Sequence, residues 1–229
     1  VTVPLPTIAA GATYQRTFRS PIDGSIQYYG VVPPSNFDPD QDYAAVLSLH
    51  GAGVGALGQA RSYSQRDWNY VIASTNRRPF GFDHEEWGRF NDLASLDDAR
   101  SVFRIDDSRT YLTGHSMGGH GTWHVGVTTP GRFALVGPSA GWESFYSYGG
   151  SPRPTGALAR SRAHSDTLVY LDNLAKRTAY IVHGDADDNV PIAEGYRMRN
   201  AMLEITDQVT MHVEPGAGHW WNGDVSVGV

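Results

Sequence analysis

The sequence predicts an α/β fold: a mostly parallel sheet of about eight strands, with an antiparallel N-terminal hairpin and helices on both faces. Its 229 residues fit the roughly 200–250 that one α/β domain can occupy. Short β-branched or aromatic runs alternate with longer stretches of helical spacing, which is typical of parallel sheets. Two early alternating strands with turn residues between them indicate the hairpin. We therefore predict a single domain over residues 1–229.

The predicted strands are short runs bounded by turn residues. Thr13–Arg19 and Ser25–Val32 alternate in polarity and form the hairpin around residues 20–24. Tyr43–His50 is continuously apolar, as expected of a central strand covered on both faces. The remaining strands are Tyr70–Ser74, Thr110–Thr113, Ala134–Val136, Ala179–His183 and Gln208–Val213.

Helices are predicted between these strands. Asp92–Phe103 places Leu93 and Leu96 on one face, and Pro191 is a good first residue for another helix. A third helix is expected over residues 119–128. The Ser-, Gly- and Pro-rich segment Ser147–Gly156 interrupts the alternation, so a small lid or insertion is predicted at about residues 142–175.

Composition excludes several classes of function. The formal net charge of −6 gives no basic footprint for a nucleic acid, and no apolar run reaches the ~18 residues of a membrane span. Cysteine is absent, which removes thiolate chemistry and disulfides. Lys176 is the single lysine among 18 basic residues, which favours a GC-rich bacterial genome. The chain starts at Val1 without a signal region, as expected of a processed or excised piece, and the compartment (secreted, periplasmic or cytoplasmic) and oligomeric state stay open.

The strongest signal for chemistry is G-H-S-M-G at residues 114–118, directly after a predicted strand and before a predicted helix. A serine in a G-x-S-x-G motif in this context is typical of a nucleophile on a sharp turn. Residues two before and two after it crowd each other, so we expect Gly114 and Gly118 to tolerate no Cβ atom. The motif predicts Ser116 as a catalytic nucleophile.

A second signal is L-S-L-H-G-A-G at residues 47–53, where a buried strand runs into a glycine-rich loop. Acyl transfer needs two backbone N–H donors for the oxygen of the tetrahedral intermediate. Met117, the residue after the nucleophile, is predicted to supply one donor and Ala52 the other. Gly53 of the same loop is predicted to contact substrate.

The other members of a triad follow in chain order. A loop with Asp185, Asp187 and Asp188 follows one strand, and His219 lies in the loop after the last strand. Ser, then Asp, then His, each beyond the C-terminal end of a strand, is the order expected on this architecture. The order alone does not choose among the three aspartates.

With these motifs, the chain resembles an α/β-hydrolase over nearly its whole length. Residues 104–123 are similar to the prolyl-oligopeptidase-like hydrolases and to the feruloyl-esterase and polyhydroxybutyrate-depolymerase group. H-G-x-x-D-x-x-V-P at 183–191 matches the acid loop of that family, so the resemblance implies that Asp187 is the acid. It also implies that His115 only packs beside the nucleophile.

Tryptophans gather at the predicted loop ends. Trp142 follows the strand Ala134–Val136, and Trp221 comes two residues after His219. Ligands of open α/β sheets bind at the C-terminal ends of the strands. We therefore predict that Trp142 and Trp221 contact an aromatic acyl group or a sugar ring.

The other histidines predict structure rather than chemistry. His120 and His124 are four residues apart on a predicted helix, but the sequence lacks the intervening Glu of H-E-x-x-H, so no metal site is predicted. His50 and His183 end strands and are expected to hydrogen-bond loops.

These patterns predict a serine esterase that hydrolyses a small-molecule or polymer-linked carboxylic ester through an acyl-enzyme, without a metal or organic cofactor. A prolyl-oligopeptidase-like serine peptidase would use the same triad, but it would need a carboxylate to anchor a peptide N-terminus, which the sequence does not locate. A catalytically silent binding domain of the same fold is the alternative from another class. Such a domain is expected to lose a triad residue, and all three candidates are present.

Overall fold

The computed structural model describes residues 7–9 and 11–220, and the strands of these residues form one eight-stranded sheet. The strands are β1 (Tyr14–Arg19), β2 (Ile26–Val32), β3 (Tyr43–Leu49), β4 (Asn69–Ala73), β5 (Ile105–His115), β6 (Leu135–Ser139), β7 (Thr178–Gly184) and β8 (Val209–Glu214). Their order in the sheet is β1-β2-β4-β3-β5-β6-β7-β8. β2 pairs antiparallel with both β1 and β4, and every later pair is parallel, which confirms the predicted fold class.

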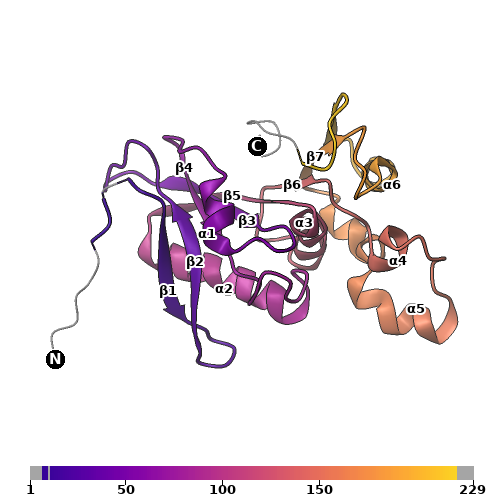
Figure 1. Ribbon diagram of the computed structural model, residues 1–229, viewed down its shortest axis with the longest axis horizontal. Helices are drawn as coiled ribbons and strands as arrows, with labels where there is room; N and C mark the ends of the chain where they lie inside the picture. The colour runs from indigo at the N-terminus through magenta and orange to yellow at the C-terminus, as the bar shows by residue number, and fades with distance from the viewer. Residues whose placement is uncertain (1–6, 10, 221–229) are drawn as a thin grey trace.

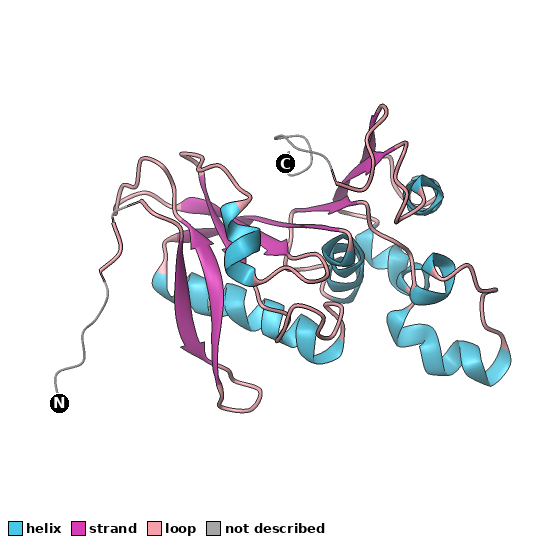
Figure 2. Ribbon diagram, in the orientation of Figure 1, coloured by secondary structure: helices cyan, strands magenta, loops and turns pink. Residues whose placement is uncertain are grey.

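The helices fill the connections between the strands (Figure 1). They are α1 (Ala56–Arg61), α2 (Glu86–Val102), α3 (Met117–Thr128), α4 (Phe145–Tyr148), α5 (Gly156–Arg162), α6 (Ile192–Leu203) and the 3₁₀ segments η1 (Ala163–Ser165) and η2 (Thr167–Leu174). Figure 2 shows α4 and α5 at the end of the molecule far from the β1–β2 hairpin. Within the described ranges, no helix has the length and apolar character that a bilayer span requires.

The predicted elements are present, but several bounds were wrong. α2 begins six residues earlier than the predicted start at Asp92, and α1 was not predicted. β5 extends well beyond Thr110–Thr113 on both sides, because its polar N-terminal half continues the pairing with β3. The segment predicted as a lid contains four short helical pieces, α4, α5, η1 and η2.

The sheet is covered on both faces because alternate residues of its strands point to opposite sides. Leu47 of β3 belongs to the larger core cluster, together with Trp123 of α3 and Met198 of α6. Its neighbour Val46 belongs to a second, smaller cluster with Ala60 of α1. α1 therefore covers the face opposite to α3 and α6.

We expect Leu112→Ala to lower the free energy of unfolding by about 2–5 kcal/mol, because it removes methyl groups and leaves a cavity. Leu112 is fully buried in β5, with Leu47 of β3 and Val136 of β6 as its register partners. Leu158→Ala is the control, since Leu158 of α5 is 62% exposed, and it should change stability by less than about 0.5 kcal/mol. Urea unfolding measures both variants, and equal losses would contradict this account of the core.

Candidate active site

Ser116 lies on the turn between β5 and α3, with the backbone in a strained conformation. Its φ is 61°, a left-handed value that non-glycine residues seldom adopt. The turn is held because the Ser116 N–H donates to the Ser139 carbonyl oxygen (2.9 Å) and the His120 N–H donates to the Ser116 carbonyl oxygen (3.0 Å). The side chain is thus presented at the N-terminus of α3, where the helix dipole favours negative charge.

The two glycines of the motif are required by close backbone approach, as predicted. A Cβ atom on Gly114 would lie 2.4 Å from the Gly118 carbonyl oxygen, and one on Gly118 would lie 2.0 Å from the Leu49 carbonyl oxygen. Neither neighbour is a flexible side chain, so the strain could not be relieved locally. The turn therefore packs directly against the end of β3.

His219 connects the serine to an aspartate. Its Nε2 lies 2.9 Å from the Ser116 Oγ, and its Nδ1 lies 2.9 Å and 3.0 Å from the two carboxylate oxygens of Asp187. The side chains of His219 and Asp187 are almost completely buried. The structure thus brings together three predicted residues that lie up to 103 positions apart in the chain.

Asp187 is held by its own loop. Its Oδ1 accepts hydrogen bonds from the N–H groups of Asn189 (2.9 Å) and Val190 (2.8 Å). Buried His183 lies beside the same carboxylate, with its Nε2 2.9 Å from the Val190 carbonyl oxygen. Asp185 instead accepts from the Gly216 N–H (2.6 Å), and Asp188 is exposed. The carboxylate facing His219 is therefore that of Asp187.

Two backbone N–H groups beside Ser116 have no acceptor among the residues that the structure describes. Among the described residues, neither the Ala52 nor the Met117 N–H donates to another group, whereas the neighbouring Gly53 N–H donates to the Pro79 carbonyl oxygen (2.9 Å). Met117 is the first residue of α3, where helical N–H groups lack an internal partner. A Cβ on Gly51 would lie 3.8 Å from the Ser116 Cβ, so the loop that contains Ala52 adjoins the serine. The predicted use of both N–H groups on a substrate oxygen stays a prediction.

His115 packs beside His219. Its ring centroid lies 4.9 Å from that of His219, and its Nδ1 lies 2.9 Å from the Ser139 Oγ. Burial, with the neighbouring His219, lowers the pKa of His115 to about 4. His115 is therefore neutral near pH 7, and it places no second positive charge against His219.

His50 and His120 have structural hydrogen-bond partners. His50 lies between the carbonyl oxygens of Gly51 and Thr75, which confirms its expected hydrogen bonds to loops. The His120 Nε2 lies 2.9 Å from a Glu85 carboxylate oxygen. Over the described ranges, no three His, Asp or Glu side chains are placed to hold a metal ion.

The structure places the predicted substrate residues differently from one another. Trp142 is only 4% exposed and packs in a cluster with Met117 and Val190. It is therefore a buried neighbour of the residue that follows Ser116. Trp221 lies outside the described residues. Gly53 is exposed, and a Cβ added to it would lie 3.1 Å from the Phe80 ring.

Two exposed aromatic rings, Trp220 and Phe80, lie beside the loop of residues 51–53, and sequence reasoning missed Phe80. Trp220 is 65% exposed, and its ring is 4.7 Å from that of His219. It also approaches Gly51, while Phe80, 73% exposed, approaches Gly53. The adjacency of Trp220 to His219 was visible in the sequence. Phe80 carried no such signal, because only the fold brings it to the loop.

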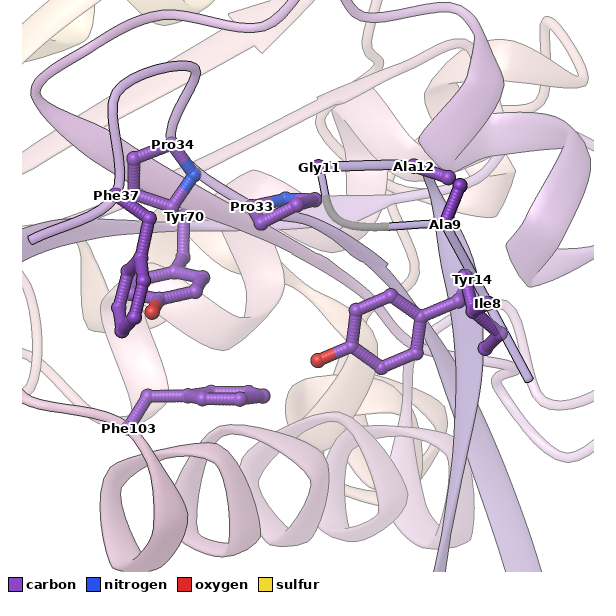
Figure 3. Close-up of a pocket in the computed structure, with 10 residues that line it drawn as sticks. All are labelled: Ile8, Ala9, Gly11, Ala12, Tyr14, Pro33, Pro34, Phe37, Tyr70 and Phe103. Atoms are coloured by element: carbon purple, nitrogen blue, oxygen red, sulfur yellow. The ribbon is translucent and has the colours of Figure 1, made fainter. Parts of the chain in front are cut away.

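An apolar pocket of about 360 Å³ lies near the N-terminal ends of the parallel strands β4 and β5, away from Ser116 (Figure 3). The rings of Tyr14, Phe37, Tyr70 and Phe103 gather around it. Tyr70 is near the start of β4, whereas Ser116 follows the end of β5. The pocket is therefore separate from the candidate active site.

Comparisons with known proteins agree with this geometry. The model of the family described as the prolyl oligopeptidase family matches residues 87–226. An uncharacterized secreted protein of Arthroderma benhamiae is 28% identical over 91% of this chain and 25% of its own length. Dipeptidyl peptidase 4 of Bos taurus is 24% identical over 80% of this chain and 27% of its own length. The chain thus spans about a quarter of the length of these relatives.

A solved structure gives a match of similar length. The S-formylglutathione hydrolase of Staphylococcus aureus superposes with a TM-score of 0.70 at 18% identity. The match covers 91% of this chain and 92% of that one. This likeness establishes the fold.

We predict that Asp187→Asn slows the reaction of Ser116 with a fluorophosphonate by about 10³- to 10⁴-fold, because Asn favours the wrong tautomer of the histidine. Asp188→Asn is the matched control from the same loop, and it should cost about tenfold or less. The second-order rate of labelling measures both variants. A large loss in Asp188→Asn with normal labelling of Asp187→Asn would show that the acid is misplaced.

Proposed function

The chain belongs to the prolyl oligopeptidase family, whose members are serine hydrolases of the α/β-hydrolase type, and from this premise we propose that it is a serine esterase. The observation that carries the proposal is the hydrogen-bonded series Ser116–His219–Asp187 beside the Ala52 and Met117 N–H groups, which have no acceptor within the described residues. In this mechanism the Ser116 Oγ attacks the ester carbonyl carbon while His219 takes its proton. Asp187 orients the imidazole and stabilises the imidazolium.

The two N–H groups supply the next requirement of the reaction. The carbonyl oxygen becomes negative in the tetrahedral intermediate, and the Ala52 and Met117 N–H groups would bind it. His219 then gives its proton to the leaving alkoxide, which leaves an acyl group on Ser116. Water attacks this acyl-enzyme with His219 as the base, and the acid product is released. No step requires a metal or an organic cofactor.

One observation supports an ester rather than a peptide as substrate. Two buried glutamates, Glu143 and Glu194, are engaged within the protein: Glu194 accepts from Arg197 (2.7 Å) and from the Glu143 N–H (2.9 Å), and Glu143 accepts from the Tyr146 hydroxyl (2.7 Å). These carboxylates are therefore less available to anchor a peptide N-terminus.

Family membership keeps a serine peptidase as the second candidate. The two activities are distinguished by comparing p-nitrophenyl esters with aminoacyl p-nitroanilides. A kcat/KM that is higher on anilides than on esters would replace the esterase with a peptidase.

The exposed rings of Trp220 and Phe80 support a preference for bulky or aromatic esters. They approach the 51–53 loop at Gly51 and Gly53, so they flank the place where a substrate must pass. Buried Trp142 would form part of the wall behind them, next to Met117. Flat aromatic groups and sugar rings stack favourably on such side chains. We propose methyl ferulate and acetylated xylan as test esters.

We expect Ser116→Ala to remove nearly all ester turnover, with a loss of kcat on the order of 10⁴- to 10⁶-fold, because triad members act as a unit. Circular dichroism and urea unfolding should show an intact fold. The wild type should be labelled by a fluorophosphonate and Ser116→Ala should not. A wild type that neither labels nor hydrolyses esters would instead indicate a silent binding domain.

We expect Trp220→Ala to raise KM for methyl ferulate by about 5- to 20-fold, which corresponds to about 1–2 kcal/mol and lies in the lower part of the ~1–3 kcal/mol attributed to ring stacking on a flat ligand, and to change KM for p-nitrophenyl acetate much less. Phe37→Ala is the control, because Phe37 is also exposed (58%) but lines the separate pocket. Michaelis–Menten kinetics on the two esters provide the comparison. Equal changes on both esters would assign Trp220 to packing alone.

A further inference from the structure

A buried Asp–His pair lies behind the loop formed by residues 51–53, here called the oxyanion loop. We propose that Asp92 and His84 are positioning residues that fix this loop, and with it the Ala52 donor, relative to Ser116. The inference rests on the proposed function, because it assigns these residues to the same reaction. Among the described residues, neither side chain forms a hydrogen bond with Ser116, Asp187 or His219.

The hydrogen bonds of His84 join a carboxylate to the main chain. Its Nε2 lies 3.1 Å from the His50 carbonyl oxygen, and its Nδ1 lies 2.9 Å from the Asp92 Oδ2. A carbonyl oxygen can only accept, so the Nε2–H donates to it. The other ring nitrogen faces the carboxylate with one proton between them. His84 and Asp92 are both fully buried, so this charge-assisted bond is shielded from water.

The residue that receives this bond is the last one before the oxyanion loop. His50 follows β3 directly, and Gly51 begins the loop. The His50 ring is itself fully buried, lies between the carbonyl oxygens of Gly51 and Thr75, and is 5.1 Å from the His84 ring. His84 thus fixes the peptide group from which the oxyanion loop departs.

The pair is anchored at its far end as well. The Ser74 hydroxyl, directly after β4, donates to the Asp92 Oδ1, and the His84 N–H donates to the Asn76 Oδ1 (3.0 Å). His84 has a φ of 60°, a conformation that costs free energy for a residue other than glycine. Such a conformation persists because surrounding contacts hold it.

His84 also contacts the helix that carries the second donor. A Cβ atom on Gly121 of α3 would lie 2.5 Å from the His84 Cβ, so the His84 side chain packs directly against the backbone of α3. Met117 is the first residue of the same helix. One buried side chain therefore borders both the strand end that leads to Ala52 and the helix that begins with Met117. The spacing of the two N–H donors depends on this contact.

This arrangement predicts a specific kinetic defect. Asp92→Asn keeps the shape but removes the charge, so the hydrogen bond to the His50 carbonyl is weakened and the oxyanion loop is less well held. The triad is unaltered, so binding of substrate should change little. We expect kcat per active site to fall about 10- to 100-fold, less than the loss of a whole oxyanion donor, with KM within about twofold.

The measurement separates positioning from folding. Titration of Ser116 with a fluorophosphonate counts the intact sites, and kcat is divided by this count. The rates of an ester and of its thiono analogue are then compared, because sulfur at the carbonyl position is bound poorly by an oxyanion hole. The ratio of the ester rate to the thiono ester rate should fall in Asp92→Asn. A merely structural role would leave both kcat per titrated site and this ratio unchanged.

Ser95→Ala is the matched control. Ser95 lies on α2 about one turn after Asp92, is fully buried, and donates to the Asn91 carbonyl oxygen (2.8 Å). Its kcat per titrated site and ester-to-thiono ratio should equal those of the wild type. Should Asp92→Asn not fold, Ser74→Ala removes the hydroxyl that holds Asp92 and should give a smaller loss of the same kind.

Failure of the inference is distinct from failure of the proposed function. If the wild type hydrolyses esters and both Asp92→Asn and Ser74→Ala keep the wild-type ratio, the positioning role is overturned and the esterase stands. If the wild type turns over no ester, the esterase proposal fails and the positioning role fails with it.

Discussion

The close backbone contact between the Ser116 turn and the end of β3 is the constraint on which the site depends. Leu49 of β3 pairs with Gly114 of β5, and the space between them admits no side chain at Gly114 or Gly118. This contact places two different chain segments against each other at one point. β3 brings the oxyanion loop, and β5 brings Ser116 with the start of α3. Parallel pairing makes this possible, since both strands end at the same edge of the sheet.

The other half of the site is assembled at a second pair of parallel strands, which β6 separates from β5. β7 and β8 pair up to Gly184 and Glu214, and the loops that follow are joined by further main-chain bonds. The Ala186 N–H donates to the Ala217 carbonyl oxygen (3.0 Å). The loop that carries Asp187 and the loop that carries His219 are thus joined by main-chain hydrogen bonding as well as by the contact between these two side chains. Both halves of the site therefore depend on the same arrangement. Two parallel strands that end side by side determine where the residues after them lie.

Sequence patterns predicted what local order determines and missed what tertiary contact determines. Tyr43–His50 was identifiable because a doubly covered strand is continuously apolar, and Ser116 because its turn requires flanking glycines. α1 was missed because it has only six residues, one of them glycine, and so too few turns to show a period. His84 had no usable pattern, since its partners lie 8 and 34 residues away. The choice of Asp187 came from family resemblance, and in the structure its carboxylate oxygens lie 2.9 Å and 3.0 Å from the His219 Nδ1.

The separation of the triad in the chain also has a consequence for folding. Ser116 and His219 are 103 residues apart, and His219 is supplied by the last strand at the edge of the sheet. Contacts this distant in sequence form slowly, because the entropy of closing a long loop is lost before the contacts contribute any stabilising free energy. An intermediate that contains β3, β4, β5 and α3 presents Ser116 on its strained turn but lacks His219. Under the proposed mechanism, labelling of Ser116 therefore reports that the chain has been assembled through β8, so labelling would measure the refolding yield.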